Sequence, residues 1–278
     1  QMFRNTWPDI KIVIGASGPI IDNRVKLQAD YWVTGFADRS LVALLDYITG
    51  RINDLDIESN NGIPVLHSDR HYLVKNMDDI ETQWKAEDRV LSYQPLPLEV
   101  SRGCIFRCAF CAFPFLGKKN YEYIRSSASI ARELRRNYEL FGTYRYTLSD
   151  DTFNDSWEKL DRLRAAIDLA GLDRFEFVGY IKPEILATNP GMSHALTDMG
   201  LRGAHLGIES FNSRSRQAIG KGMNIDRILD VTEELRSSGV GMHATFITGL
   251  PGETIDECYA TNDWLCQHTN SHFQSWGW

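Results

Sequence analysis

Short apolar runs alternate with amphipathic segments from residue 96 onward, and this pattern predicts repeated strand–helix units. The expected strands lie at 96–100, 144–148, 175–181, 203–208 and 242–248, with a sixth, cut short, at 271–278. Units of this kind imply parallel strands joined by right-handed crossovers. The predicted fold class is therefore α/β, and we expect residues 96–278 to form a partial (β/α) barrel of about six strands.

Polar residues mark where several of the intervening helices begin. Asp155 with Glu158, and Thr254 with Glu257, have the spacing of capping boxes. Asn224 precedes another apolar-periodic segment and is expected to cap it. These positions predict that a helix follows three of the strands within a few residues.

The first fifty residues carry the pattern of a doubly wound sheet. The run IKIVIGASG at 10–18 predicts a buried parallel strand that opens into a tight loop, and a second strand is expected at 31–35. Ser40 is expected to cap the helix that follows. Ligands of such sheets bind at the carboxyl ends of the strands, so Ser17 and Gly35 lie where a cofactor would. Turn formation is the other interpretation of these small residues.

Residues 51–95 show little periodicity and are rich in Asp and Asn. We expect an irregular linker here, with one short hairpin around 63–73. Pro95 and Pro97 mark its end. The predicted organisation is a partial Rossmann-like domain over 1–50, a linker over 51–95 and a barrel domain over 96–278.

Composition limits the partners and the location. The 278 residues are 43% hydrophobic and 24% charged, as in ordinary globular proteins, and the net charge of -7 argues against a broad nucleic-acid or membrane surface. No apolar run is long enough to span a bilayer, and no secretory signal is visible. We therefore expect a cytoplasmic protein. The start at Gln1 and the end inside a strand suggest that both termini are truncated.

Three of the five cysteines, Cys104, Cys108 and Cys111, fall within the segment EVSRGCIFRCAFC. Clustered thiolates are the ligands of iron-sulfur clusters, and because a cubane has four irons, three cysteines leave one iron open. A structural zinc ion needs a fourth ligand, yet no histidine lies between His71 and His194. A disulfide scaffold calls for an even set in a small secreted chain. Zinc binding and simple burial stay open as alternatives.

The segment CIFRCAFC, with Phe110 before its last cysteine, resembles the signature of the radical S-adenosylmethionine (radical SAM) superfamily. The resemblance implies a TIM-type barrel core and a [4Fe-4S] cluster on the three cysteines. It implies that SAM occupies the open iron and is cleaved to a 5'-deoxyadenosyl radical. A flavodoxin-like or ferredoxin-like partner would donate the electron.

The partial domain upstream resembles the cobalamin-binding domain of B12-dependent radical SAM proteins. The resemblance implies that Ser17 and Gly35 contact cobalamin. The sequence departs from that family pattern because the DxHxxG element, which supplies an axial histidine in many cobalamin proteins, is absent.

The resemblance also implies that SAM is bound by polar residues at the ends of the predicted strands. Residues 149–151 stand in the place of a GGE-type motif but read SDD, and TFITGLPGE at 245–253 is similar to the region that packs on adenine and ribose. A turn or surface role is the alternative at each position. The implied SAM contacts are Phe110, Ser149, Asp150, Asp151, Lys182, Glu209, Lys221, Thr245 and Gly249.

The expected function is that of a radical SAM enzyme, with cobalamin-dependent methyl transfer or a radical rearrangement at an unactivated carbon. One alternative is a B12-independent radical SAM enzyme that modifies RNA or a peptide. Another is a non-catalytic zinc or iron-sulfur interaction module. The substrate, a small molecule or a peptide, is not specified by the sequence, and no catalytic acid or base can be named. Cys258 and Cys266 are expected to be packing residues.

Overall fold

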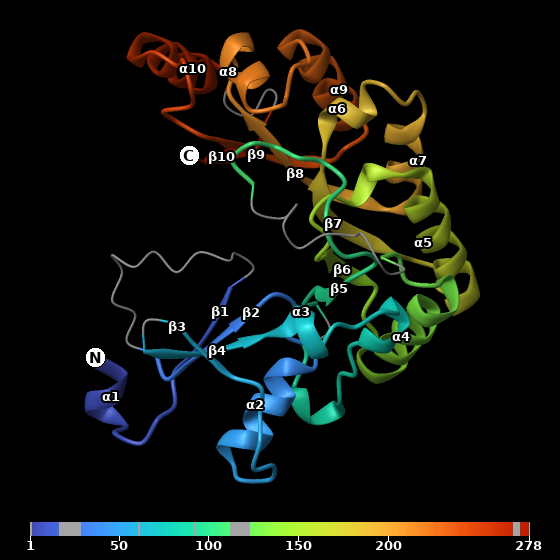
Figure 1. Cartoon of the computed structure of the whole chain (residues 1–278). Coiled ribbons are helices and arrows are strands. Elements are labelled where there is room, and N and C mark those ends of the chain that lie inside the picture. Colours follow the sequence, from blue (N-terminus) through green and yellow to red (C-terminus); the bar gives the residue numbers. More distant parts are fainter. Residues whose placement is uncertain are drawn as a thin grey trace.

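Within the described residues the chain forms two sheets, one near the N-terminus and one from residue 96 onward (Figure 1). The computed structural model describes residues 2–16, 29–60, 62–91, 93–111, 123–268 and 273–277. Ser17, one of the two expected cobalamin contacts, lies outside them. Within these ranges no helix has both the length and the apolar character that crossing a membrane requires.

The N-terminal sheet has the order β1-β2-β4-β3. Strands β1, β2 and β4 are parallel, and β3 pairs antiparallel with β4. The elements up to the second sheet are α1 (Met2–Thr6), β1 (Val13–Ala16), β2 (Tyr31–Thr34), α2 (Ser40–Ile48), β3 (Glu58–Asn60), β4 (Ile63–His67), α3 (Ser68–His71), η1 (Met77–Ile80) and η2 (Ala86–Asp88).

The second sheet holds six parallel strands in chain order, β5 to β10. Its elements are β5 (Leu96–Leu98), α4 (Ser127–Phe141), β6 (Arg145–Leu148), η4 (Phe153–Asp155), α5 (Trp157–Ala170), β7 (Glu176–Ile181), α6 (Pro183–Leu186), α7 (Met192–Met199), β8 (Leu201–Glu209), α8 (Ser213–Ala218), α9 (Ile225–Ser237), β9 (Gly241–Phe246), α10 (Ile255–Gln267) and β10 (Ser275–Gly277). The predicted α/β class and partial barrel are confirmed.

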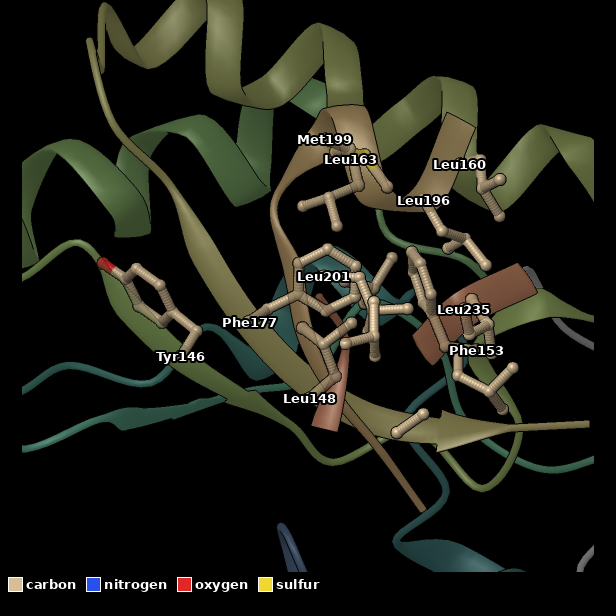
Figure 2. Close-up of a cluster of buried hydrophobic side chains, with 14 of the residues drawn as sticks. Tyr146, Leu148, Phe153, Leu160, Leu163, Phe177, Leu196, Met199, Leu201 and Leu235 are labelled. Atoms are coloured by element: carbon tan, nitrogen blue, oxygen red, sulfur yellow. The ribbon is translucent and has the colours of Figure 1, made fainter. Parts of the chain in front are cut away.

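Alternation along the strands separates the core from the barrel interior. One side of the sheet is buried under helices, and its side chains form the main apolar core together with leucines of α5 and α7 (Figure 2). On β7, for example, Phe177 and Ile181 are buried, whereas Tyr180 between them is exposed. Because the helices cover only the outer side, the inner side is left available for polar residues.

The predicted linker is wrong where residues 58–67 form β3 and β4. Val65 and Leu66 are almost completely buried, and they lie in register with Trp32 and Val33 of β2. The apolar run is short enough for a strand, but its partner lies some thirty residues earlier, so the local pattern does not reveal the pairing. The expected hairpin at 63–73 is instead the β3–β4 pair.

Two of the expected helix caps are confirmed. Thr254 and Glu257 form a capping box at the start of α10, and the Asn224 side chain accepts a hydrogen bond from the Asp226 amide at 2.7 Å. These side chains satisfy backbone donors that have no partner within the helix.

Two other expected caps are wrong. At the start of α5, Ser156 rather than Asp155 accepts the amide of Lys159. Ser40 is itself the first residue of α2, and its hydroxyl is buried 2.5 Å from that of Ser68. Asp155 instead pairs with the Lys159 ammonium four residues on, and the Ser40 hydroxyl meets that of Ser68, so in both cases another contact of the side chain prevails over the capping preference.

Arg102, two residues before Cys104, joins the N-terminal sheet to the start of the second sheet. Its guanidinium donates to Glu99 at 2.7 Å and to Asp38 at 3.1 Å, and it stacks on the Phe36 ring at 4.4 Å. Arg102 is only 8% exposed, so its charge is compensated mainly by these two carboxylates. The loop after β2 is therefore fastened two residues away from Cys104.

Candidate functional site

A cavity of about 330 Å³ opens at the carboxyl ends of β6 to β9, beside the cysteine segment. It brings together the three cysteines and every expected SAM contact except Gly249. Its walls are formed by Cys104, Phe106, Cys108, Phe110, Cys111, Ser149, Asp150, Asp151, Thr152, Tyr180, Ile181, Lys182, His205, Leu206, Gly207, Glu209, Lys221 and Thr245.

The cysteine segment is held against the strand ends by contacts along its length. The Cys104 Sγ atom lies 3.4 Å from the Thr152 hydroxyl, and the Ala109 amide donates to the Ile219 carbonyl at 3.2 Å. The Cys111 amide donates to the Cys108 carbonyl at 3.0 Å, which closes a turn. All three thiols are half-buried and face the same cavity.

The arrangement of these thiols distinguishes between the possible metal centres. All five cysteines are free, which excludes the disulfide interpretation. Among the described residues no three Cys, His, Asp or Glu side chains converge closely enough to hold one metal ion. A zinc ion needs such convergence, with sulfur atoms about 2.3 Å away. In a cubane each thiolate binds a different iron, so separated thiols around one cavity fit a cluster better.

Asp150 supports the loop after β6 and is unsuited to contacting a ligand. Its carboxylate is completely buried and accepts hydrogen bonds from the Val100 amide at 2.9 Å and the Ser101 hydroxyl at 2.6 Å. Burial raises the pKa of Asp150 to about 6, although the nearby Lys159 ammonium lowers it. Of the two expected carboxylates, Asp151 is the half-buried one at the cavity wall.

Lys159 of helix α5 holds the same loop in place. Its ammonium is completely buried, 2.8 Å from an Asp155 oxygen and 3.8 Å from an Asp150 oxygen, and it donates to the Thr152 carbonyl at 2.7 Å. One cation thus contacts two carboxylates and a backbone carbonyl inside the protein. The contacts fix the positions of Ser149 and Thr152 at the cavity wall.

Glu209 and Lys221 form a buried ion pair at the end of β8. The Lys221 Nζ atom lies 3.1 Å from Glu209 Oε1 and also donates to the Gly207 carbonyl. Glu209 has a left-handed φ of 67°, and the register with β9 shifts between Gly207 and Glu209. A residue other than glycine rarely adopts such a backbone, and strained residues of this kind cluster at functional sites.

Gly207 provides the space that this ion pair needs. A Cβ atom at this position would lie 2.4 Å from Glu209 Oε1 and 3.0 Å from Lys221 Nζ. Any side chain here would push the pair apart or move it into the cavity. The absence of a side chain at Gly207 is therefore part of the site.

Lys182 lies between the cysteine segment and the sheet. Its ammonium is 3.9 Å from the centre of the Phe106 ring and 3.9 Å from the Cys108 Sγ atom. The backbone of Lys182 exchanges two hydrogen bonds with the Asn154 side chain, at 2.8 and 3.0 Å. A cation is thus fixed at the end of β7, next to the thiols.

The remaining expected contacts are placed differently. Thr245 lies at the cavity wall, whereas Gly249 is exposed in the loop beyond β9 and donates its amide to Glu253 at 2.8 Å. The exposed Phe110 lies at the wall. Gly35 follows β2 with a φ of 81° and does not line this cavity.

Sequence reasoning missed several wall residues, chiefly Tyr180 and His205. Tyr180 lies two residues before Lys182, and His205 lies two residues before Gly207. Both side chains are on the inner side of their strands. The period of two along β7 and β8 is the signal that could have identified them. Phe106 and Thr152 belong to loops and have no comparable pattern.

A model of the family described as "Radical SAM superfamily" matches residues 98–265, more than half of the chain. The chain is also 26% identical over 203 residues to a protein named an uncharacterized methyltransferase from Pyrococcus horikoshii. That match covers 68% of this chain and 41% of the relative. The chain therefore spans less than half the length of the relative.

Two solved structures are similar to most of the described fold. TsrM from Kitasatospora setae, a radical SAM methyltransferase with tryptophan substrate and a SAM analog bound, has a TM-score of 0.62 and 17% identity, covering 86% of this chain and 49% of its own. OxsB, a cobalamin-dependent SAM radical enzyme, has a TM-score of 0.60 and 15% identity, covering 91% of this chain and 38% of its own. At these identities the likeness shows the fold alone.

The raised pKa of Asp150 makes a testable contribution to the pH dependence of stability. Because this carboxyl binds its proton more tightly in the folded state, its contribution to stability falls as the pH rises from about 4 to 7. Asp150→Asn removes this titration. Between about pH 4.5 and pH 7, we expect the unfolding free energy of the variant to decline by about 2 kcal/mol less than that of the unsubstituted protein. Urea unfolding at both pH values measures the difference, and parallel pH profiles would contradict it.

Proposed function

Because the chain belongs to the radical SAM superfamily, we propose that it acts as a cobalamin-associated radical SAM methyltransferase. One observation carries the proposal: a single cavity joins three free thiols to the polar ends of four parallel strands. The name of the Pyrococcus relative supports methyl transfer. The folds of TsrM and OxsB support the pairing of a barrel with a second, N-terminal sheet.

Cys104, Cys108 and Cys111 would hold a [4Fe-4S] cluster at the mouth of the cavity. When bound and reduced, the cluster supplies the electron that splits SAM into methionine and a 5'-deoxyadenosyl radical. The chain itself fixes the positions of the thiols through Thr152 and the backbone of Ile219. Thiols that bind a cluster must stay reduced, which supports a cytoplasmic location with a flavodoxin-like or ferredoxin-like partner as the proposed electron source.

The charged and polar side chains around the cavity suit the carboxylate and ammonium groups of SAM. Lys182 offers a cation beside the thiols, where it would pair with the SAM carboxylate. Ser149 and Asp151 offer oxygen acceptors in the loop after the neighbouring strand β6, as the SAM ammonium requires. The Glu209–Lys221 pair would orient SAM through its own remaining hydrogen-bonding capacity, since a paired carboxylate still has open lone pairs.

The N-terminal sheet provides an edge for cobalamin. Strands β1, β2 and β4 are parallel, so their carboxyl ends lie along one edge. Gly35 follows β2 there in a left-handed conformation, and without a side chain it lets a flat ligand approach the backbone. Phe36 and Asp38 of the same loop contact Arg102, next to the cysteine segment. A cobalamin on this edge would thus adjoin the SAM cavity, where it would supply a methyl carrier.

Cys108→Ala tests the central assignment. The variant removes one cluster ligand, so after anaerobic reconstitution we expect no stable [4Fe-4S] signal in electron paramagnetic resonance and no 5'-deoxyadenosine from SAM. The matched control is Cys266→Ala, which removes an exposed thiol from α10. Equal iron content and equal 5'-deoxyadenosine in both variants would contradict the proposal. A colourless protein with stoichiometric zinc would instead indicate the non-catalytic module.

Gly207→Ala tests whether the strand ends bind SAM. The added methyl group collides with the Glu209–Lys221 pair, so we expect the affinity for SAM to fall at least about tenfold, measured by equilibrium dialysis with the reconstituted protein. Gly222→Ala is the control, because a Cβ atom there meets nothing within 4 Å. If both variants bind SAM as the unsubstituted protein does, SAM does not occupy this cavity.

Cobalamin binding is tested at Gly35. We expect the protein to retain hydroxocobalamin through gel filtration and Gly35→Val to lose it, because the new side chain covers the strand edge. Gly50→Val imposes a similar backbone strain, since Gly50 has a φ of 73° against 81° for Gly35, but it lies at the far end of α2. Retention by Gly35→Val, or loss by both variants alike, would remove cobalamin from the proposal.

A further inference from the structure

A row of four polar or aromatic side chains crosses the inner side of the second sheet, one layer below the strand ends. Tyr180 pairs in register with His205, His205 with His243, and His243 with Ser275. The row lies two residues before Lys182, Gly207, Thr245 and Gly277 on the same four strands, a depth of about 6–7 Å. Tyr180 and His205 belong to the wall of the SAM cavity.

The side chains of this row contact one another across the strands. The rings of Tyr180 and His205 lie 5.1 Å apart at an angle of 34°, and those of His205 and His243 lie 5.7 Å apart at 66°. The His243 Nδ1 atom is 2.7 Å from the Ser275 hydroxyl. These contacts fix the ring planes, so the row is a preorganised aromatic surface.

The row is not part of the apolar core. Tyr180 is 53% exposed in the middle of the sheet, whereas its neighbour Ile181 is 2% exposed. Among the described residues, neither the Tyr180 hydroxyl nor the ring nitrogens of His205 have a hydrogen-bond partner. Inside a barrel, a large exposed aromatic ring beside imidazole nitrogens that lack hydrogen-bond partners in the described part of the chain indicates a ligand-binding surface.

The layer beneath the row contains two glycines, and larger side chains occupy the space above them. The layer below pairs Val178 with Gly203 and Gly203 with Gly241. A Cβ atom at Gly203 would lie 2.7 Å from Val178 Cγ1, and one at Gly241 would lie 2.5 Å from Gln274 Oε1. The side chains of Val178 and Gln274 thus fill the space over these glycines. A ligand that enters from the strand ends would therefore go no deeper than the row.

The His205 ring gives the row an uncharged surface at the cavity wall. Burial lowers the pKa of His205, and the nearby His243 lowers it further, so the His205 imidazole is neutral at pH 7. The charged groups of the cavity lie higher, where Glu209 and Lys221 are paired and Lys182 is next to the thiols. An anionic or cationic group at the level of the row would lack a counter-charge there, whereas a planar ring would stack and use the open hydrogen-bonding groups.

We propose that Tyr180 and His205, with the His243 ring packed beside His205, form the substrate-binding layer of this cavity and hold a neutral, planar, hydrogen-bonding ring. The inference rests on the proposed function, because a substrate must lie next to the carbon radical that is generated at the strand ends. It narrows the substrate to molecules or polymer residues that carry such a ring, as an indole or a nucleobase does.

Binding of simple probes to the reconstituted protein, with saturating SAM, tests the inference. We expect equilibrium dialysis to show that indole binds more tightly than cyclohexanol, which lacks the planar ring, and than benzoate, which adds a charge. Tyr180→Ala and His205→Ala should each raise the dissociation constant of indole about tenfold. His194→Ala is the matched control, because it removes an imidazole that is 72% exposed on the outer helix α7.

Tyr180→Leu and His205→Leu keep the apolar volume and serve where the alanine variants do not fold. Equal binding of cyclohexanol and indole, tighter binding of benzoate, or unchanged indole binding in the substituted proteins would overturn the inference. Formation of 5'-deoxyadenosine is measured on the same unsubstituted preparation. SAM cleavage without ring binding contradicts this inference alone, and ring binding without SAM cleavage contradicts the proposed function alone.

Discussion

Lys159 is a completely buried cation, and the cavity wall depends on the contacts that it makes. Two carboxylates and a carbonyl of the loop after β6 are oriented around its ammonium group. Burying these charges is costly unless each is compensated, so removing Lys159 would leave Asp150 unpaired in the interior. The loop therefore has one well-determined position, and Ser149 and Thr152 reach the cavity as a result. The cysteine segment is in turn positioned by Thr152.

The same constraint recurs at the other strand ends. Two further ion pairs fix loops near the rim of the sheet, Glu209 with Lys221 and Arg102 with Asp38. These pairs fix the loops without filling the cavity. The arrangement combines a rigid rim with an inner side of glycines and half-exposed rings. SAM binding is proposed for the rim, and substrate binding for the rings.

The sequence was sufficient for the six strands of the second sheet, for their parallel order and for most of the expected SAM contacts at the cavity wall, because the carboxyl ends of parallel strands must meet at one edge. It did not show which carboxylate of SDD is exposed, since burial of Asp150 depends on Val100 and Ser101, about fifty residues away. Gly249 matched a motif, yet its amide is turned toward Glu253. The row through His205 depends on strand register, which residue types do not encode locally.

At one edge of the second sheet, β5 has no paired strand among the described residues. Exposed strand edges invite pairing with other chains and lead to aggregation. β5 is only three residues long and contains Pro97, which has no amide hydrogen to donate. An incoming strand would find few consecutive backbone groups to pair with, so this edge offers little template for self-association.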